Sequence, residues 1–375
     1  MNIHSLTKKK LSKCDRVLYL HCDHFEPTNT NYSLDQTNQI LKTFTGQAID
    51  SAIKPSLFLH LPADIYWKEG KFYLQKLSTY PIVMSYIKQL SDIGCDIQWH
   101  IHHEYWTNSS VVKGEWKQIL DRGLVKDEET LEFFISETKK IYKECGLPNV
   151  DTWGIVHGMW ALNASDSLNC NITNELSILR RNGCLADFTF PAGRPWCTPE
   201  MTGIFAVTPK NEPKCYNTGT TIARGTKLLQ DGTNFVICYP TSNYIVISLD
   251  LINSYLDKVG TKSDCYHTVI SPENVHMLED PLDFAQEWIL TSCIIDRTLI
   301  IKTHAHSLNV EAWKNKEGNI VNNSTLFSVS HKERLQVLQD ICQATNVDFR
   351  FTTAKEVMNI IKWIDSGEDS KNYEF

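Results

Sequence analysis

Two histidines, His100 and His102, stand one residue apart in segment 95–105, and this spacing can bind a metal ion. The residues before them alternate between apolar and polar, which predicts a β-strand. Side chains two apart on a strand point to the same face, about 7 Å apart along the chain. Two imidazole rings so placed can converge on one ion. His103 would face the other side of a regular strand, so we expect it not to be a ligand.

An acidic segment, 21–27, follows the first apolar run of the chain. Its carboxylates, Asp23 and Glu26, could ligate a metal or accept a proton as a general base. His24 could be a further ligand. A turn or cap is the structural alternative, because Asp and Pro are common there. The high density of titratable side chains in this segment favours a functional site over a turn or cap.

A second histidine pair, His304 and His306, follows the apolar run 299–301. One of these histidines could act as a general acid that protonates a leaving amine. The other could orient that acid or bind the substrate. The structural alternative is a pair of surface histidines after Lys302.

Polar residues at the ends of two further predicted strands suit sugar recognition. His157, Trp160 and Asn163 offer an aromatic face for a sugar ring and an amide for its hydroxyls. A packed tryptophan beside polar turn residues would give the same pattern. Asp187 lies in an otherwise apolar strand and therefore needs a partner or a role, and Arg194 could supply the partner.

The elements that must position these residues alternate between strand and helix. Besides the histidine segment, strands are predicted at 15–21, 56–60, 151–157, 184–190, 298–302 and 347–351. Helices are predicted at 34–53, 81–93, 128–145, 173–182, 281–291, 331–345 and 354–364, and a small hairpin at 66–74. Such alternation is typical of an α/β fold with a parallel sheet or barrel.

The domain organisation follows from where this alternation stops. Residues 193–265 are rich in Pro, Gly, Thr and Asn, and we interpret them as a β-rich insertion with strands at 235–239 and 244–248. We expect one domain over 1–365 and a disordered tail over 366–375. In parallel α/β folds ligands bind beyond the carboxyl ends of the strands, where each polar cluster is predicted to fall.

Composition excludes several classes of function. The net charge of −7, without a long basic run, argues against a nucleic-acid partner. No apolar run is long enough for a signal peptide or a membrane span, so we expect a cytoplasmic protein; the oligomeric state stays open. The 12 cysteines form no Cys-x-x-Cys pair and lie mostly in apolar runs. We interpret them as reduced core residues rather than metal ligands.

Taken together, the motifs at 22–26, 100–102 and 302–306 resemble those of the polysaccharide deacetylase superfamily, the NodB-homology or carbohydrate esterase family 4 group. The segments 157–163, 183–191 and 351–356 resemble an uncharacterised bacterial branch associated with surface-polysaccharide synthesis. The chain departs from the family pattern in two places: it lacks an Asp-Asp pair, and its histidine spacing is His-x-His rather than His-x-x-x-His.

The resemblance implies a distorted (β/α) barrel of the glycoside hydrolase and deacetylase type, with a divalent metal, in the first instance zinc. Asp23, His100 and His102 would hold the metal, with His24 as an alternative ligand. Glu26 or Asp23 would be the base, and His304 or His306 the acid. The implied reaction removes an N-acyl group, in the simplest case acetyl, from an amino sugar or glycoconjugate.

The implied sugar site and two alternative functions complete these expectations. The residues that would shape the sugar site are His157, Trp160, Asn163, Asp187 and Arg194. A glycoside hydrolase on the same barrel would instead use Asp23 or Glu26 with Asp187. The third hypothesis is a carbohydrate-binding protein without catalytic activity.

Overall fold

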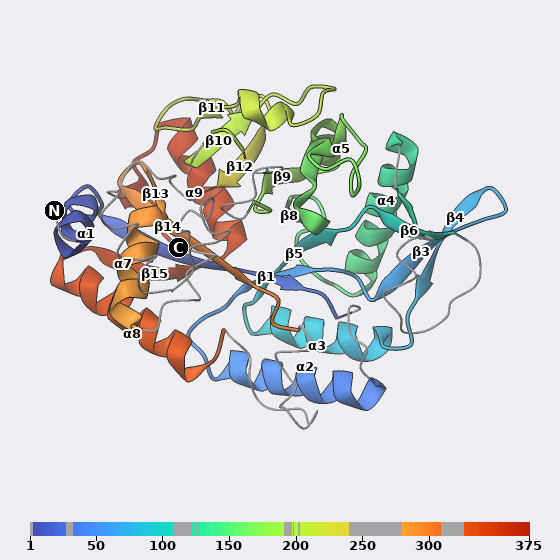
Figure 1. Cartoon of the computed structure of the whole chain (residues 1–375), viewed down its shortest axis with the longest axis horizontal. Coiled ribbons are helices and arrows are strands. Elements are labelled where there is room, and N and C mark those ends of the chain that lie inside the picture. Colours follow the sequence, from blue (N-terminus) through green and yellow to red (C-terminus); the bar gives the residue numbers. More distant parts are fainter. Residues whose placement is uncertain are drawn as a thin grey trace, which may run out of the picture.

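The chain forms a mixed α/β fold around one large, mostly parallel sheet (Figure 1). The computed structural model describes residues 3–27, 33–107, 122–124, 127–190, 197, 199–201, 203–239, 280–308 and 326–375. Along the sheet the strands follow the order β11, β10, β12, β9, β8, β5, β2, β1, β14, β13. The alternation of strand and helix predicted from the sequence is therefore confirmed.

The central strand is β1 (Arg16–Phe25), every residue of which is buried. It forms parallel ladders with three strands: β14 (Thr298–Ala305), β2 (Ser56–Leu59) and β15 (Asp348–Thr352). β14 lines one edge of β1. β15 and β2 share the other edge, β15 along the first half of β1 and β2 along the second. A strand that is covered on both faces has a nearly continuous apolar sequence, and this apolar run is why β1 could be predicted.

The remaining strands extend the sheet on both sides. They are β5 (Asp96–Ile101), β8 (Trp153–His157), β9 (Cys184–Asp187), β10 (Gly203–Val207), β11 (Thr220–Thr221), β12 (Phe235–Tyr239) and β13 (Cys293–Ile295). β10, β11 and β12 come from the predicted insertion, and β10 pairs antiparallel with both of its neighbours. The strand predicted at 244–248 lies outside the described residues.

The sheet curls without closing, so the distorted (β/α) barrel that the resemblance implies is not closed among the described residues. The two ends of the sheet approach each other: a Cβ placed on Gly203 of β10 would lie 3.9 Å from the Cβ of Cys293 of β13. β10 already has β11 on one side and β12 on the other. No ladder joins β10 to β13 among the described residues, and the hydrogen-bonded path runs from β11 to β13 without closing.

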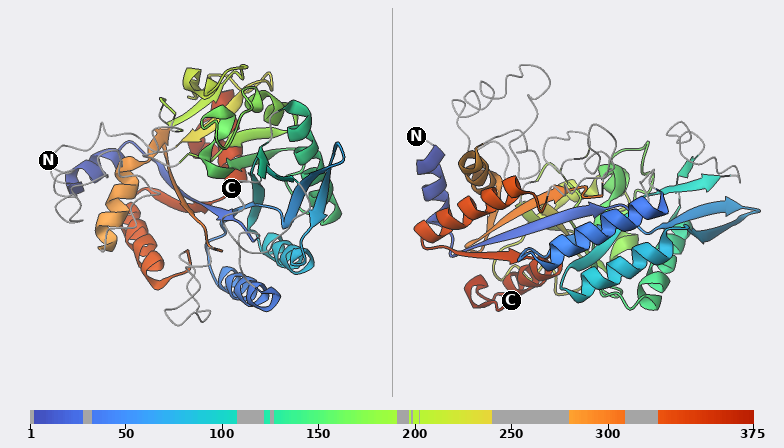
Figure 2. Two further views of the ribbon diagram at one scale, coloured as in Figure 1. Left: turned by 45° about the vertical axis from the view of Figure 1, so that its right-hand side comes forward. Right: turned by 90° about the horizontal axis from the view of Figure 1, so that it is seen from below.

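The helices cover the outer face of the curled sheet (Figure 2). They are α2 (Leu34–Ile49), α3 (Tyr80–Asp92), α4 (Glu128–Glu144), α5 (Glu175–Arg181), α7 (Pro281–Thr291) and α8 (Val329–Ala344), while α1 (Ile3–Leu11) packs beside α7. Several begin at side-chain caps, such as the capping box that Ser33 and Gln36 form at α2. Among the described residues, no helix has both the length and the apolar character needed to cross a bilayer.

The inner face of the sheet packs against α9 (Ala354–Ser366) instead. Leu18, Leu20 and Cys22 of β1 belong to this inner cluster of apolar residues. Val17 and Tyr19, which alternate with them, belong to the outer one. β1 therefore sends even-numbered and odd-numbered side chains into different surroundings, and this alternation decides which of its polar side chains can meet those of its neighbours.

A small second sheet lies beside the carboxyl end of β5. The predicted hairpin at 66–74 is present as β3 (Ala63–Lys68) and β4 (Lys71–Lys76), turning at Glu69 and Gly70, both with positive φ. β6 (Glu104–Thr107) and β7 (Arg122–Leu124) complete this sheet. β6 begins immediately after His103, so the histidine segment leads from one sheet into the other.

The C-terminal residues, expected to be disordered, are packed against the body of the protein. Ser370 is buried in a short 3-10 turn, and its backbone N–H donates to Asp296 Oδ2 over 2.8 Å. Arg16 donates to the Ser370 carbonyl over 3.2 Å. Tyr373 also packs against the inner apolar cluster, with its ring 5.9 Å from that of Trp363 between centroids. The polar composition of the tail misled the prediction, because hydrogen bonds and aromatic contacts together hold it in place.

Asp365 links α9 to the insertion and offers a test of the fold. Its buried carboxylate accepts hydrogen bonds from the backbone of Leu228 and Leu229 and from the hydroxyl of Thr226, over 2.7–2.9 Å. We expect Asp365→Ala to lower the free energy of unfolding by about 2–3 kcal/mol, because the buried donors lose their acceptor. Chemical denaturation measures this loss. Glu368→Ala, at an exposed neighbour, is the control, and equal stability of the two variants would contradict the role of Asp365.

Candidate functional site

Polar side chains gather on the inner face, where β1, β2, β5 and β14 end. Their positions in the sequence are all even, as the alternation requires, because the inner face also receives Cys22, Phe58 and Ile300. The group consists of Glu26 and six histidines: His24, His60, His100, His102, His304 and His306. We call it the inner cluster.

Glu26, His100 and His102 form the centre of this inner cluster. Glu26 Oε1 lies 2.8 Å from His100 Nε2 and 3.6 Å from His102 Nε2. The two Nε2 atoms are 3.1 Å apart. Atoms bound at about 2.0–2.1 Å to one tetrahedral zinc ion lie about 3.3 Å from each other. These three residues could therefore hold a metal ion together.

The hydrogen bond at the far side of the His100 ring determines what its Nε2 can do. Nδ1 lies 2.7 Å from the Val156 carbonyl oxygen, so Nδ1 carries the proton and donates it. In the neutral ring, Nε2 then presents a lone pair to the Glu26 carboxylate. Two lone pairs facing each other repel, and a cation between them removes that repulsion.

The pKa shifts keep Glu26 deprotonated and favour a neutral His100. Burial would raise the pKa of Glu26, but hydrogen bonds from His100 and His102, and the positive charge of these rings when protonated, outweigh burial and hold this pKa well below its usual range. Burial also lowers the pKa of His100, against the opposing effect of Glu26. Deprotonated carboxylate and neutral imidazole are the forms that ligate metals.

His24 and His306 share Glu26 in a second, overlapping group that could also hold a metal ion. The ring of His24 lies 4.5 Å from that of His306 and 5.2 Å from that of His304, between centroids. Burial lowers the pKa of His24 well below its usual value, and the neighbouring histidines lower it further. His24 is buried whereas His306 is exposed, so the inner cluster reaches the surface through His306.

Asp23, predicted as a metal ligand or base, lies on the other face of β1. Its carboxylate accepts from the backbone N–H of Ser307 over 3.2 Å and from the hydroxyl of Ser307. His21 Nε2 is 3.5 Å away. The structure therefore does not bring Asp23 to His100 and His102. The carboxylate beside these histidines is Glu26, which follows the last residue of β1 and continues the even-numbered face of that strand.

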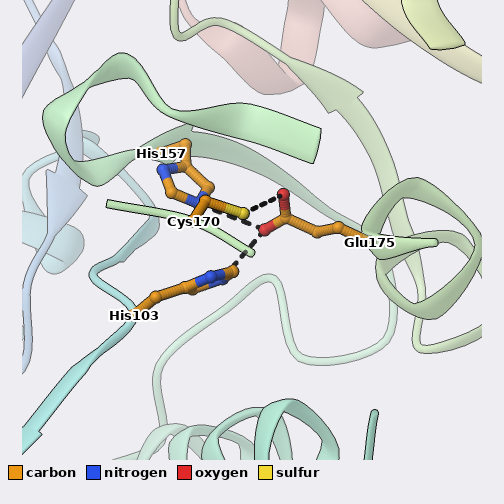
Figure 3. Close-up of side chains that lie close together, drawn as sticks. All are labelled: His103, His157, Cys170 and Glu175. Carbon is orange, nitrogen blue, oxygen red and sulfur yellow. Dashed lines mark hydrogen bonds and ion pairs between the residues drawn. The ribbon is translucent and has the colours of Figure 1, made fainter. Parts of the chain in front are cut away.

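A second group of potential ligands lies on the outer face of the sheet (Figure 3). It contains His103, His157, Cys170 and Glu175, and we call it the outer cluster. His103 follows β5, His157 ends β8, and Glu175 begins α5. All four residues are buried, and the cluster could hold a metal ion.

Glu175 is the centre of the outer cluster. Its Oε1 lies 2.9 Å from His103 Nε2 and 3.2 Å from His157 Nε2, and its Oε2 lies 3.5 Å from Cys170 Sγ. Burial would lower the pKa of His103, but the charges of Cys170 and Glu175 outweigh it and raise this pKa to about 9. Burial would raise the pKa of Glu175, but the two histidines hold it well below its usual range.

The structure separates the residues predicted for sugar binding. His157 belongs to the buried outer cluster, and Asn163 is buried beside it, with its backbone N–H donating to Glu175. Asp187 has no exposed surface, and its carboxylate accepts from the backbone N–H and the hydroxyl of Thr189. Trp160 is partly buried against the outer core. Arg194 lies outside the described residues.

Cys170 and Glu175 were missed by the sequence reasoning. Cys170 was grouped with the core cysteines because it belongs to no Cys-x-x-Cys pair, and Glu175 was interpreted only as part of a helix. The available signal was the position of His103 and His157 at the ends of predicted strands. Their partners come from the long connection after β8, whose path the sequence does not reveal.

Comparison with protein-family models, with curated proteins and with solved structures finds no match for this chain.

Gly158 connects the two clusters. Its carbonyl lies 2.6 Å from His157 Nδ1, and a Cβ on Gly158 would lie 2.5 Å from Cγ of the His102 ring. Glycine is therefore required where the His102 ring lies against this backbone.

We expect Gly158→Ala to displace His102 and to weaken divalent-metal binding at the inner cluster by at least about tenfold. A competition titration of zinc against a chromogenic chelator measures this. Gly46→Ala in α2 is the control, since no atom lies within 4 Å of its added methyl group. Unchanged affinity in Gly158→Ala would show that His102 is not held in this way.

Asp187 makes stability depend on pH. Burial raises its pKa to about 7, against the hydrogen bonds from Thr189, whereas an unfolded Asp has a pKa of about 3.9. The folded protein binds this proton more tightly, so the associated stability is complete below about pH 4 and is lost as the pH rises through about 7.

We expect Asp187→Asn to remove this dependence. Relative to the wild type, its free energy of unfolding should increase between pH 5 and pH 7, by up to about 1.4 kcal/mol per pH unit. Denaturant titrations across this pH range provide the measurement. The Asp50→Asn substitution, at an exposed carboxylate, is the control. A difference between Asp187→Asn and the wild type that does not change with pH would contradict the raised pKa.

Proposed function

We propose that the inner cluster is the active site of a metal-dependent hydrolase. The enzyme would remove an N-acyl group, in the simplest case acetyl, from an amino sugar in polysaccharide or glycoconjugate synthesis. The observation that carries the proposal is the convergence of Glu26 Oε1, His100 Nε2 and His102 Nε2 within 3.6 Å of one another, beyond the carboxyl ends of β1 and β5.

Glu26, His100 and His102 would hold the metal. The donor set fits a divalent ion, because one carboxylate and two imidazoles whose Nε2 atoms face it leave room for a further ligand. Zinc suits this set, and other first-row metals suit it too. A divalent ion in this position polarises an acyl carbonyl and lowers the pKa of water.

The remaining histidines would handle protons. His24 is buried with a lowered pKa, so it is neutral at pH 7 and can accept a proton. His306 is exposed at the edge of the inner cluster, where it can donate a proton to a departing nitrogen, and His304 lies beside both. This assignment places the base on His24 rather than on Asp23, since the Asp23 carboxylate is bonded to Ser307 on the other face.

The sugar substrate is supported by the motifs at 22–26, 100–102 and 302–306, which are similar to those of polysaccharide deacetylases. The curled sheet fits a distorted barrel of that type. A glycoside hydrolase has less support, because it needs two carboxylates about 5–10 Å apart around an accessible bond. Within the described inner cluster the carboxylate is Glu26, and Asp187 has no exposed surface.

We expect the zinc-loaded protein to release acetate from at least one member of a panel of N-acetylated amino sugars, which includes free, oligomeric and nucleotide-linked forms. Glu26→Gln and His100→Ala should reduce the rate by at least about 100-fold, because each removes a ligand. The exposed His4→Ala in α1 is the matched control and should retain full activity.

Acetate and new reducing ends should be measured in the same samples. Reducing ends without acetate would identify a glycoside hydrolase. Sugar binding without turnover, retained in His100→Ala, would identify a non-catalytic binding protein. Either result would contradict the proposed reaction.

A further inference from the structure

The outer cluster differs from the inner cluster in being sealed. The side chains of His103, His157 and Glu175 have no exposed surface, and Cys170 is fully buried. Figure 3 shows all four side chains pointing toward one another from separate segments of the chain. Four convergent ligands without an open position are typical of a structural metal site.

Several polar atoms of the outer cluster lack a hydrogen bond of normal geometry to any described residue. They are His103 Nδ1 and Nε2, His157 Nε2 and Glu175 Oε1. Each such buried atom costs about 1–3 kcal/mol when it stays unsatisfied. The Nε2 atoms lie 2.9 and 3.2 Å from Glu175 Oε1, close enough to share one ion with it.

The hydrogen bonds around the outer cluster orient these atoms inward. His157 Nδ1 donates to the Gly158 carbonyl over 2.6 Å, which leaves the lone pair on Nε2 directed at Glu175. The backbone N–H of Ala164 donates to Cys170 Sγ over 3.3 Å, and that of Asn163 donates to Glu175 Oε2. Backbone donors directed at a sulfur and at a carboxylate stabilise their negative forms.

The charges of the outer cluster balance around a divalent cation. A thiolate and a carboxylate carry two negative charges, and two neutral imidazoles carry none. Zinc binds this combination of sulfur, nitrogen and oxygen ligands in tetrahedral geometry. Without an ion, the Glu175 carboxylate is enclosed with two imidazoles, whose Nε2 atoms lie 2.9 and 3.2 Å from its Oε1, and with a thiol. A divalent cation can replace the proton that this carboxylate and the imidazoles otherwise share.

We propose that His103, His157, Cys170 and Glu175 form a second, structural zinc site. The ion would tie the ends of β5 and β8 to the connection at 158–174 and to α5. It would thereby fix the backbone that carries His102 and Gly158. This site is independent of the proposed function, since it shares no ligand with the inner cluster.

Sulfur distinguishes the two sites in the unaltered protein, because the inner cluster contains no cysteine among its ligands. Full-length protein is incubated with excess zinc, desalted and examined by zinc X-ray absorption. We expect a sulfur shell at about 2.3 Å from part of the zinc. Cobalt in place of zinc should give a thiolate-to-cobalt charge-transfer band. A zinc-loaded protein with neither signal would overturn the proposal.

The zinc content of single-residue variants tests whether the sulfur ligand is Cys170. We expect Cys170→Ala to bind one zinc equivalent fewer than the wild type and to lose the cobalt band. Cys184→Ala, at another fully buried cysteine, should keep both. His100→Ala should lose zinc from the inner cluster but keep the band, so failure of one site is distinguishable from failure of the other. Equal zinc content and an unchanged band in Cys170→Ala would refute the site.

Discussion

The strict alternation of side chains along strands buried on both faces is the constraint on which the two clusters depend. In β1 and β5, even positions face α9 and odd positions face the outer helices. His102 and His103 follow β5 directly, yet they end in different surroundings because they are adjacent in the chain. One short histidine segment can therefore supply ligands to two separate groups.

The difference in burial between the clusters sets what each can do. The side chain of His102 is 17% exposed and that of Glu26 is 11% exposed, so the inner cluster is open to solvent. The outer cluster has no such access and can act only through stability and position. The backbone at Gly158 links the two clusters, because the ring of His102 packs directly against it. A shift of the outer cluster would therefore also move His102.

Much of the fold could be predicted from the sequence, because apolar periodicity reports burial directly. β12 and α7 were predicted with the same boundaries as those observed, and most other elements differ by a few residues at their ends. The open sheet could not be predicted, since it depends on whether β10 and β13, far apart in the sequence, form a ladder.

The candidate sites were predictable only in part. Clustering at strand ends follows from the parallel fold, and it led to His100 and His102. The choice between Asp23 and Glu26 required the face that each residue occupies, which the resemblance to a known motif did not supply. Cys170 and Glu175 could not be found, because they lie in a connection without periodicity and meet the histidines only through tertiary structure.

The shared edge of β1 has a consequence for the order in which the molecule can be built. β1 is synthesised first, but its neighbours β14 and β15 lie near the other end of the chain. A nascent chain can pair β1 with β2 early, whereas the other ladders must wait until residues 298–352 have been synthesised. Until then the central strand has unpaired edges and exposed apolar side chains, so we infer that the partly synthesised chain is prone to aggregation.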